Sequence, residues 1–393
     1  MKRFIMIILC LSLFIPFVVS AQTEEKEEEN KETTNLITNA KSGILLDYDS
    51  GTVIFEKKAD TKLSIASLTK MTAQIIILEN IEQGKIKWDD IITVSENAAS
   101  FGGSQIYLEP NEKMSVEDLF KGISVASAND ATVAMAEAIA GSEEEFVKLM
   151  NKKVEELGLK NTHFSNCTGL DVDNHYSTAR DLSVIARELL SHEKILEFSS
   201  IYEDYLREDT ENKFWLVNTN KLVRQYQGAD GLKTGHTDAA GYCLAATAKK
   251  NDMRLIAIVL GEENSKVRNS ETMALLDYGF DLYEVNVIQK KDTKIDTLTL
   301  DKADKENVDI VLKENVSIFK KKTDKDIDYT TQLQLNEIKL PVKQGDTVGK
   351  VLVKDNNNKT IATTEVTVKE DIKKIHLLGL YIRNLKEIFT SAI

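Results

Sequence analysis

The sequence predicts a mixed α/β domain with an α-rich lobe, followed by a small all-β domain and a C-terminal amphipathic helix. Three observations indicate this fold class. Helix-like and strand-like segments are interleaved over residues 36–283, short β-rich segments separated by polar turns follow at 284–369, and residues 370–393 repeat apolar residues at helical spacing. The chain has 393 residues, of which 42% are hydrophobic, enough for a large domain and a smaller one.

The chain begins with the features of an export signal. Two basic residues precede an apolar stretch at 4–19, and Ser20-Ala21 supplies small residues suited to cleavage before position 22. The apolar stretch is short for a membrane span. We therefore expect residues 1–21 to be a signal peptide and the protein to be exported, with an uncleaved signal anchor as the alternative.

The charge of the chain excludes one broad class of function. A formal net charge of −13 leaves no basic stripe that could neutralise phosphates, so we expect no nucleic-acid partner. Part of the acidity is local, because glutamates cluster between Glu24 and Glu32, where like charges cannot pack. Residues 22–35 are therefore expected to form a disordered acidic linker.

Within the first domain, strands are expected at both ends and helices between them. The predicted elements are a hairpin at 41–57, a helix at 66–79, further helices to about 196, strands at 242–247 and 254–260, and a helix at 271–280. A mixed sheet whose first strands come from the start of the domain and whose last strands come from its end, with helices on both faces, fits this order.

The remaining segments complete the predicted architecture. Residues rich in Val, Ile, Thr and Lys predict strands at 308–312, 330–335 and 348–353 in the second domain. In the last segment one helical face carries Ile375, Leu378, Ile382, Leu385 and Phe389. Such a helix could dock on its own β domain. We favour attachment to a membrane surface, because the chain carries an export signal and the helix has lysines near both ends.

Two cysteines would remain after removal of the signal peptide. Cys167 and Cys243 are far apart in sequence, and we expect free, packed thiols because sequence alone cannot assign a bond. The five histidines are scattered, and no set of Cys and His has metal-ligand spacing. The sequence therefore predicts neither a metal nor another cofactor.

The first chemical motif is a serine followed by a lysine three residues later. On a helix, Ser67 and Lys70 share one face about one turn apart, so the hydroxyl and the amine can touch. Lysine can deprotonate a serine only if its pKa falls well below the ordinary value of about 10.4. The pattern alone is weak, because helix surfaces produce it by chance.

Two further motifs follow in a fixed order. Ser127-Ala128-Asn129 by itself could be a polar turn between helices, and Lys233-Thr234-Gly235 by itself could be the start of a strand. The ordered set S-x-x-K, S-x-N and K-T-G is similar to the signature of serine penicillin-recognising enzymes. Three ordered matches rarely coincide by chance, so the set indicates a nucleophilic serine.

The resemblance extends from about residue 36 to 281. It is to the low-molecular-mass penicillin-binding proteins that act as D-alanyl-D-alanine carboxypeptidases, and it implies a β-lactamase/transpeptidase-like fold for residues 36–283. The matching stretches are ASLTKMT (66–72), SANDA (127–131), GLKNTHFSNCTGLD (158–171), HYSTARD (175–181) and GLKTGHT (231–237). One departure is Cys167, where many members have alanine or proline. We expect an altered loop there rather than lost activity.

The resemblance implies catalytic roles for three side chains. Ser67 would attack the carbonyl of the penultimate D-alanine and form an acyl-enzyme, with Lys70 as the proton acceptor. Ser127 would pass a proton between Lys70, Lys233 and the leaving amine. Asn129 would hold the amide side chain of the substrate or the Lys70 amine.

The resemblance also implies how the third motif binds substrate. Lys233 and Thr234 would receive the terminal carboxylate, and Gly235 would keep the strand edge open. The backbone N–H groups of Ser67 and His236 would form the oxyanion hole. Arg268 has two interpretations, an aid to carboxylate binding or a solvated surface arginine.

The expected partners are therefore peptidoglycan stem peptides ending in D-Ala-D-Ala, β-lactam antibiotics, and the outer face of the cytoplasmic membrane through the last helix. Three other functions share the motifs. A D,D-endopeptidase that cuts cross-links would use the same site, and a non-catalytic wall-binding protein could keep the fold. A β-lactamase is disfavoured because no glutamate-containing loop between the second and third motifs is evident and because a β domain follows.

Overall fold

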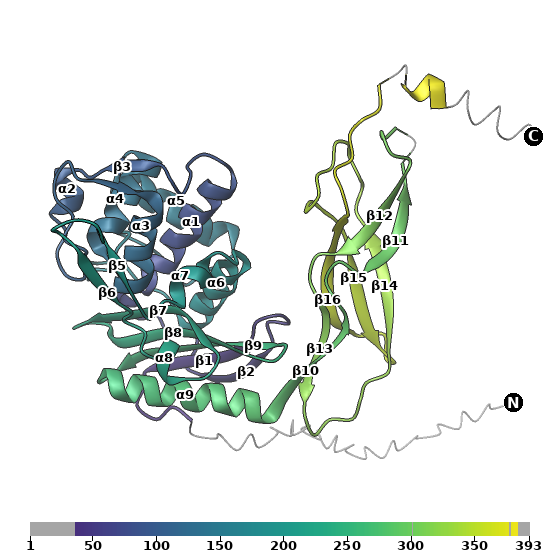
Figure 1. Ribbon diagram of the computed structural model, residues 1–393. Helices are drawn as coiled ribbons and strands as arrows, with labels where there is room; N and C mark the ends of the chain where they lie inside the picture. The colour runs from purple at the N-terminus through teal and green to yellow at the C-terminus, as the bar shows by residue number, and fades with distance from the viewer. Residues whose placement is uncertain (1–35, 301, 377–378, 384–393) are drawn as a thin grey trace, which may run out of the picture. The chain divides into compact units, whose positions relative to one another are not determined.

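The structure is a computed structural model that describes residues 36–300, 302–376 and 379–383 (Figure 1). The predicted signal peptide and acidic linker lie outside the described residues, as do residues 377–378 and 384–393 of the predicted C-terminal helix. Within the described chain, an α/β domain with an α-rich lobe is followed by an all-β domain, so the predicted fold class is confirmed.

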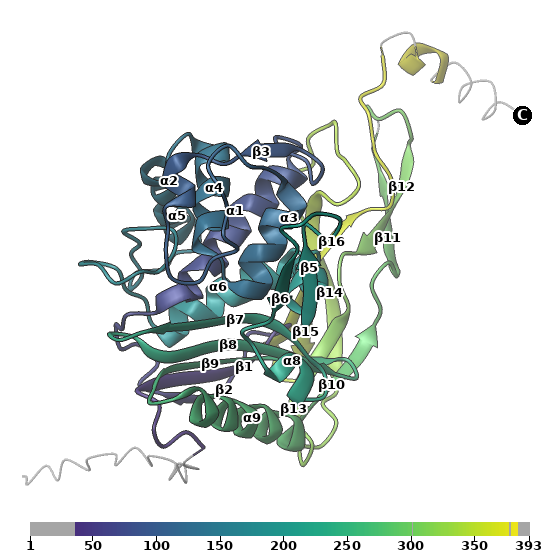
Figure 2. The same cartoon turned by 60° about the vertical axis from the view of Figure 1, so that its left-hand side comes forward.

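A five-stranded sheet forms the base of the first domain (Figure 2). Its strand order is β2-β1-β9-β8-β7. The strands are β1 (Ser42–Asp47), β2 (Val53–Lys57), β7 (Ala229–Thr237), β8 (Gly241–Lys250) and β9 (Met253–Glu262). Every neighbouring pair is antiparallel, so the expectation of a mixed sheet was wrong about strand direction. The reason is that short turns join β1 to β2, β7 to β8 and β8 to β9, and such turns reverse the chain.

Both faces of this sheet are buried, which explains the nearly continuous apolar stretches in β8 and β9. Alternate side chains belong to two hydrophobic clusters, with Ile256 and Ile258 in one and Leu255 and Ala257 in the other. Helix α9 (Ser265–Leu282) covers one face and the α-rich lobe covers the other (Figures 1 and 2). The sheet can therefore hold a rigid edge strand beside the lobe.

The α-rich lobe contains both long and short helices. They are α1 (Lys70–Glu82), α2 (Glu96–Ala99), α3 (Val116–Lys121), α4 (Asn129–Ala140), α5 (Glu143–Glu156), α6 (Ala179–Ser191), α7 (Ile195–Ser199) and α8 (Leu222–Gln225). Serine or threonine side chains accept from backbone N–H groups at the starts of α3, α5 and α6, as expected of N-caps. Helix α1 is buried from Lys70 to Leu78, because apolar residues occupy all of its faces there.

Two small two-stranded sheets were not predicted, one within the predicted run of helices and one after it. They are formed by β3 (Ile91–Thr93) with β4 (Lys113–Ser115) and by β5 (Glu203–Leu206) with β6 (Phe214–Val217). Strands of three or four residues are too short to show a two-residue period, which is why the sequence did not reveal them.

The second domain is all-β, as predicted. Its larger sheet has the order β11-β12-β16-β15-β14 and antiparallel pairing, and β10 pairs with β13. The strands are β10 (Tyr283–Gln289), β11 (Lys294–Thr299), β12 (Asn307–Leu312), β13 (Val316–Lys321), β14 (Tyr329–Leu335), β15 (Thr347–Asp355) and β16 (Thr360–Val368). Buried valines and isoleucines give this domain its own core.

Of the predicted C-terminal helix, residues 370–376 and 379–383 are described. Residues 379–383 are helical, but 370–376 are not: Ile372 and Lys374 form isolated β-bridges with Val342 and Ala303, so the prediction of a helix from residue 370 was wrong at its start. Arg383 donates a hydrogen bond to the carbonyl of Ala303. Among the helices that the structure describes, none combines the length and the apolar character needed to cross a membrane.

Candidate active site

Ser67 lies in a turn of 3₁₀-helix, η1 (Ala66–Thr69), directly before α1. The amine of Lys70, the first residue of α1, donates a hydrogen bond of 2.8 Å to the Ser67 hydroxyl. The predicted contact between the two side chains is therefore present, although the serine precedes the α-helix rather than lying within it.

The Lys70 amine is fully buried and surrounded by acceptors. It donates to the side-chain oxygen of Asn129 at 2.7 Å and to the carbonyl of Thr168 at 2.6 Å. Burial disfavours the charged form and lowers the pKa of Lys70 to about 7. A neutral amine is therefore accessible near neutral pH, as a base for the serine requires.

The second motif joins a π-helical turn, η2 (Gly122–Ala126), to the start of α4. Ser127 adopts the left-handed conformation, with φ of 63°, and lies at the cleft described below. The side chain of Asn129 makes two hydrogen bonds. Its oxygen accepts from Lys70, and its nitrogen donates to the carbonyl of Gly102 at 2.7 Å. Asn129 thus links Lys70 to the loop that carries Ser104.

The third motif lies on β7, the edge strand of the sheet. Lys233 is buried, and its pKa is held well below the ordinary value by burial and by the positive charges of Lys70 and Arg268. A Cβ at Gly235 would lie 2.8 Å from the carbonyl oxygen of Ile65 and 3.1 Å from the backbone nitrogen of Ser67. Only glycine lets β7 approach the η1 turn this closely.

These elements surround one cleft of about 460 Å³, a size suited to a small ligand. Of the nine predicted site residues, Ser67, Ser127, Thr234, Gly235, His236 and Arg268 line it. The other three, Lys70, Asn129 and Lys233, are almost fully buried and do not line it. Arg268, on α9, is 5% exposed, so the alternative of a solvated surface arginine was wrong.

Comparison with known proteins identifies the family. Residues 27–264 match the family described as D-alanyl-D-alanine carboxypeptidase, and residues 283–374 match the C-terminal domain of penicillin-binding protein 5. The chain is 44% identical to D-alanyl-D-alanine carboxypeptidase DacF of Bacillus subtilis, over 98% of each chain. The chain belongs to the D-alanyl-D-alanine carboxypeptidase family. The predicted family and enzyme class are thereby confirmed.

Further relatives of this carboxypeptidase agree. It is 35% identical to D-alanyl-D-alanine carboxypeptidase DacA of Escherichia coli, over 89% of this chain and 88% of that one. The crystal structure of penicillin-binding protein 5 from Haemophilus influenzae matches with a TM-score of 0.66 at 32% identity. That match covers 86% of this chain and 98% of the other.

Several residues of this carboxypeptidase cleft were missed from the sequence. Thr219 follows β6 and accepts a hydrogen bond of 2.7 Å from the Thr234 hydroxyl. No feature of the sequence indicated that these residues line a site, because single polar residues in loops are also common in ordinary turns. The further lining residues are Ser104, Val217, Asn218, Lys221, Tyr242, Ser265 and Asn269.

His175 contacts the η1 turn through the side chain of Thr69. Thr69 donates to the carbonyl of Ala66 at 2.8 Å, so its hydroxyl oxygen accepts from Nε2 of His175, 2.7 Å away. The other ring nitrogen accepts from the backbone N–H of Ser165. The ring is therefore neutral with its proton on Nε2, and burial lowers its pKa to about 4.

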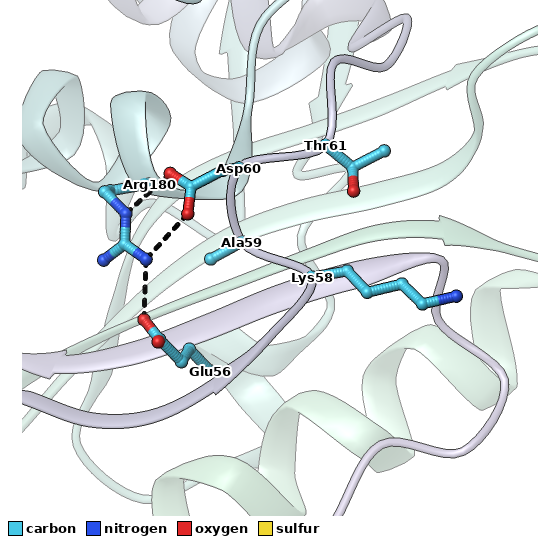
Figure 3. A pocket seen from close by; sticks show the side chains of 6 residues that line it. All are labelled: Glu56, Lys58, Ala59, Asp60, Thr61 and Arg180. Atoms are coloured by element: carbon cyan, nitrogen blue, oxygen red, sulfur yellow. Dashed lines mark hydrogen bonds and ion pairs between the residues drawn. The ribbon is translucent and has the colours of Figure 1, made fainter.

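A second hollow in the surface is lined by Lys58, Ala59 and Thr61 and by a cluster of three charged side chains (Figure 3). The guanidinium of Arg180 donates to Asp60 at 2.7 Å and to Glu56 at 2.8 Å. These charges satisfy one another at the surface, and the hollow contains none of the predicted site residues. We assign it no function.

Both cysteines that the structure describes, Cys167 and Cys243, are buried and free, as predicted. Burial raises the pKa of each thiol, so both are neutral at ordinary pH.

Proposed function

We propose that this protein is an exported serine carboxypeptidase that removes the terminal D-alanine from peptidoglycan stem peptides, with Ser67 as its nucleophile. The hydrogen bond from the buried Lys70 amine to the Ser67 hydroxyl carries this proposal. It joins a base with a pKa of about 7 to a hydroxyl that faces the cleft.

Acylation begins when neutral Lys70 takes the proton of Ser67 while the serine oxygen attacks the carbonyl of the penultimate D-alanine. The negative charge that forms on the carbonyl oxygen is stabilised by the backbone N–H groups of Ser67 and His236. The C–N bond then breaks, and the departing D-alanine receives its proton from Lys70 through Ser127. Water hydrolyses the resulting ester and releases the shortened peptide.

The substrate carboxylate is held by the side chains of Arg268, Thr234 and Lys233. Arg268 and Thr234 line the cleft, and Lys233 is buried. A terminal carboxylate is a strong hydrogen-bond acceptor, and fixed donors near the nucleophile orient the scissile bond. This arrangement favours cleavage next to a free C-terminus, as in a carboxypeptidase.

β-Lactams enter the same cleft and acylate Ser67. None of the described lining residues is Asp or Glu, so the lining offers no carboxylate to activate a water for fast deacylation. We therefore expect a persistent acyl-enzyme rather than β-lactamase turnover.

The domain limits and cellular location are part of the proposal. Residues 1–21 would direct export and 22–35 would be an acidic linker, while 370–393 would attach the protein to the outer face of the cytoplasmic membrane. Residues 36–283 would form the catalytic domain and 284–369 the β domain. The two family matches, which end at 264 and begin at 283, support the boundary between the domains.

The decisive test measures D-alanine release from a pentapeptide ending in D-Ala-D-Ala, together with mass spectrometry of the intact protein after exposure to penicillin. Wild type should release D-alanine and gain one adduct on the peptide that contains Ser67. Ser67→Ala should lose both properties, with Ser64→Ala as the matched control. Retained labelling in Ser67→Ala would mean another nucleophile, and cleavage only of cross-linked dimers would mean an endopeptidase.

A further inference from the structure

A cluster of metal-ligating side chains lies away from the cleft, where two long helices of the lobe end. Glu79 is near the C-terminus of α1, Glu188 is in the last turn of α6, and His192 directly follows α6. One potential ligand atom from each side chain lies within 4.8 Å of the other two. At about 1.5 Å of rise per residue, Glu79 is about 13 Å along α1 from Lys70. The cluster is therefore separate from the catalytic centre.

The surroundings of His192 indicate that this cluster binds a ligand. Its side chain is 9% exposed, and its Nδ1 lies 2.8 Å from a carboxylate oxygen of Glu82. Its Nε2 is buried and has no hydrogen-bond partner in the described part of the chain. An unsatisfied buried nitrogen costs about 1–3 kcal/mol, so the ring is poorly matched to its protein neighbours alone.

The hydrogen bond to Glu82 fixes the chemistry of the ring. A carboxylate can only accept, so Nδ1 carries a proton, and in the neutral ring Nε2 presents a lone pair. One ring nitrogen of His192 lies within 4.8 Å of a carboxylate oxygen of both Glu79 and Glu188. Because Glu82 engages Nδ1, Nε2 is the ring atom that is available to a ligand in the described part of the chain. A lone pair beside two carboxylates is stabilised by a cation, and a carboxylate that orients a metal-binding histidine from behind is a common arrangement.

The surrounding charges also favour a cation. Helices α1 and α6 both direct the negative ends of their dipoles toward this region, because all three residues lie at or near the helix C-termini. One competing cation is present: the Lys153 amine lies 2.6 Å from one oxygen of Glu79. Lys153 also contacts Glu156 at 3.0 Å, so it keeps a partner if Glu79 turns to a metal.

We propose that Glu79, Glu188 and His192 bind a divalent transition metal of the Zn²⁺ class and clamp the end of α1 to the end of α6. One imidazole nitrogen with two carboxylate oxygens suits zinc, with water completing a tetrahedral shell, whereas Mg²⁺ and Ca²⁺ prefer oxygen ligands alone. Helix α1 begins at Lys70, so the metal fixes the far end of the helix that carries the catalytic base.

The test uses the full chain, treated with a chelator and then titrated with ZnCl₂ by calorimetry and with CoCl₂ by visible absorption. We expect one metal per chain and a cobalt spectrum typical of tetrahedral nitrogen and oxygen ligands. His192→Gln and Glu188→Gln should each weaken zinc binding at least tenfold, because each removes a ligand and Glu188→Gln keeps the side-chain shape. Circular dichroism verifies that the variants fold, and if His192→Gln does not fold, Glu188→Gln decides.

Two further variants sharpen the result. Glu193→Gln makes the same change of charge at the neighbouring exposed position and should bind zinc as wild type does. Lys153→Met should bind more tightly, because it removes the cation that competes for Glu79. Absence of one-to-one binding, equal affinity in Glu188→Gln and wild type, or equal weakening in Glu193→Gln would overturn the proposal.

Discussion

At the scale of single residues, we expect the buried side chain of Lys70 to set the pH at which the enzyme works. Because burial lowers its pKa to about 7, the amine is protonated below that pH and cannot accept the serine proton. We expect the second-order rate of acylation by a β-lactam to rise roughly tenfold per pH unit below about 7 and to level off above it. Stopped-flow measurement of acylation from about pH 5 to about pH 9 checks this profile.

A matched pair of lysine variants distinguishes the loss of the catalytic base from the loss of one positive charge. Lys70→Met should lose acylation by at least a thousandfold, on the order of what general-base removal costs. Lys85→Met, at an exposed position on the same lobe, should keep the wild-type profile. A flat profile for wild type in this range would contradict the role given to Lys70.

Among single residues, those of the candidate site that could be predicted from the sequence are either close together along the chain or part of an ordered set of motifs. Ser67 and Lys70 are one turn apart, so local geometry alone brings them together. Thr219 could not be found, because only the folded sheet carries Thr234 to it. Glu79 and His192 are likewise far apart in sequence, which is why scattered histidines indicated no metal.

At the scale of elements, the predicted helices of the first domain were placed correctly but their ends were shifted. The predicted helix at 271–280 is α9, which begins at Ser265 because the side chain of Asn264 accepts from the N–H groups of Lys266 and Val267. The apolar period starts later than this cap, so periodicity alone placed the helix start too far along. The strands predicted at 242–247 and 254–260 are the centres of β8 and β9.

The loop that packs against the η1 turn depends on one glycine, Gly169. Gly169 has φ of 88°, and a Cβ there would clash with the carbonyl of Ala66 and lie 2.9 Å from the backbone nitrogen of Ser67. Gly169→Ala should therefore displace η1 and lower the rate of acylation at least tenfold. It should also lower the free energy of unfolding by about 2–3 kcal/mol.

Gly158→Ala is the matched control for this prediction. Gly158 also has a positive φ, 70°, but a Cβ there would meet no atom within 4 Å. Its substitution should cost only the backbone penalty of about 1 kcal/mol and leave acylation unchanged. Urea denaturation and acylation rates measure both variants, and equal effects would show that the contact with η1 does not matter.

At the scale of the whole molecule, the order of domains was predictable because each has its own hydrophobic period and its own core. What could not be predicted is how distant segments of the first domain are tied together. Glu271 on α9 accepts hydrogen bonds from the backbone N–H groups of Thr38, Asn39 and Ala40, which joins the first described residues to the last helix of that domain. Such bonds leave no trace in a sequence pattern.

Glu262 lies beside Glu271, and we expect it to make the stability of the fold depend on pH. Both of its carboxyl oxygens are buried without a donor in the described chain, and burial, together with the neighbouring Glu271, raises its pKa to about 8. For Glu271 burial acts in the raising direction, but the neighbouring Glu262 and the three backbone donors outweigh it and lower its pKa to about 2. The pair therefore holds one proton, on Glu262, over most of the accessible pH range.

The sign of the effect follows from the raised pKa. Unfolded Glu262 releases its proton near its ordinary pKa of 4.5, whereas folded Glu262 keeps it to about 8, so its contribution to stability is full below 4.5 and is lost as pH rises to 8. We expect the free energy of unfolding to fall by about 2 kcal/mol between about pH 5 and about pH 8 from this group. Glu262→Gln keeps the shape of the protonated acid and should remove this part of the decline, whereas Glu263→Gln, at an exposed position, should not. Urea denaturation at both pH values measures all three proteins. An equal decline in Glu262→Gln and wild type would show that the buried proton is not on Glu262.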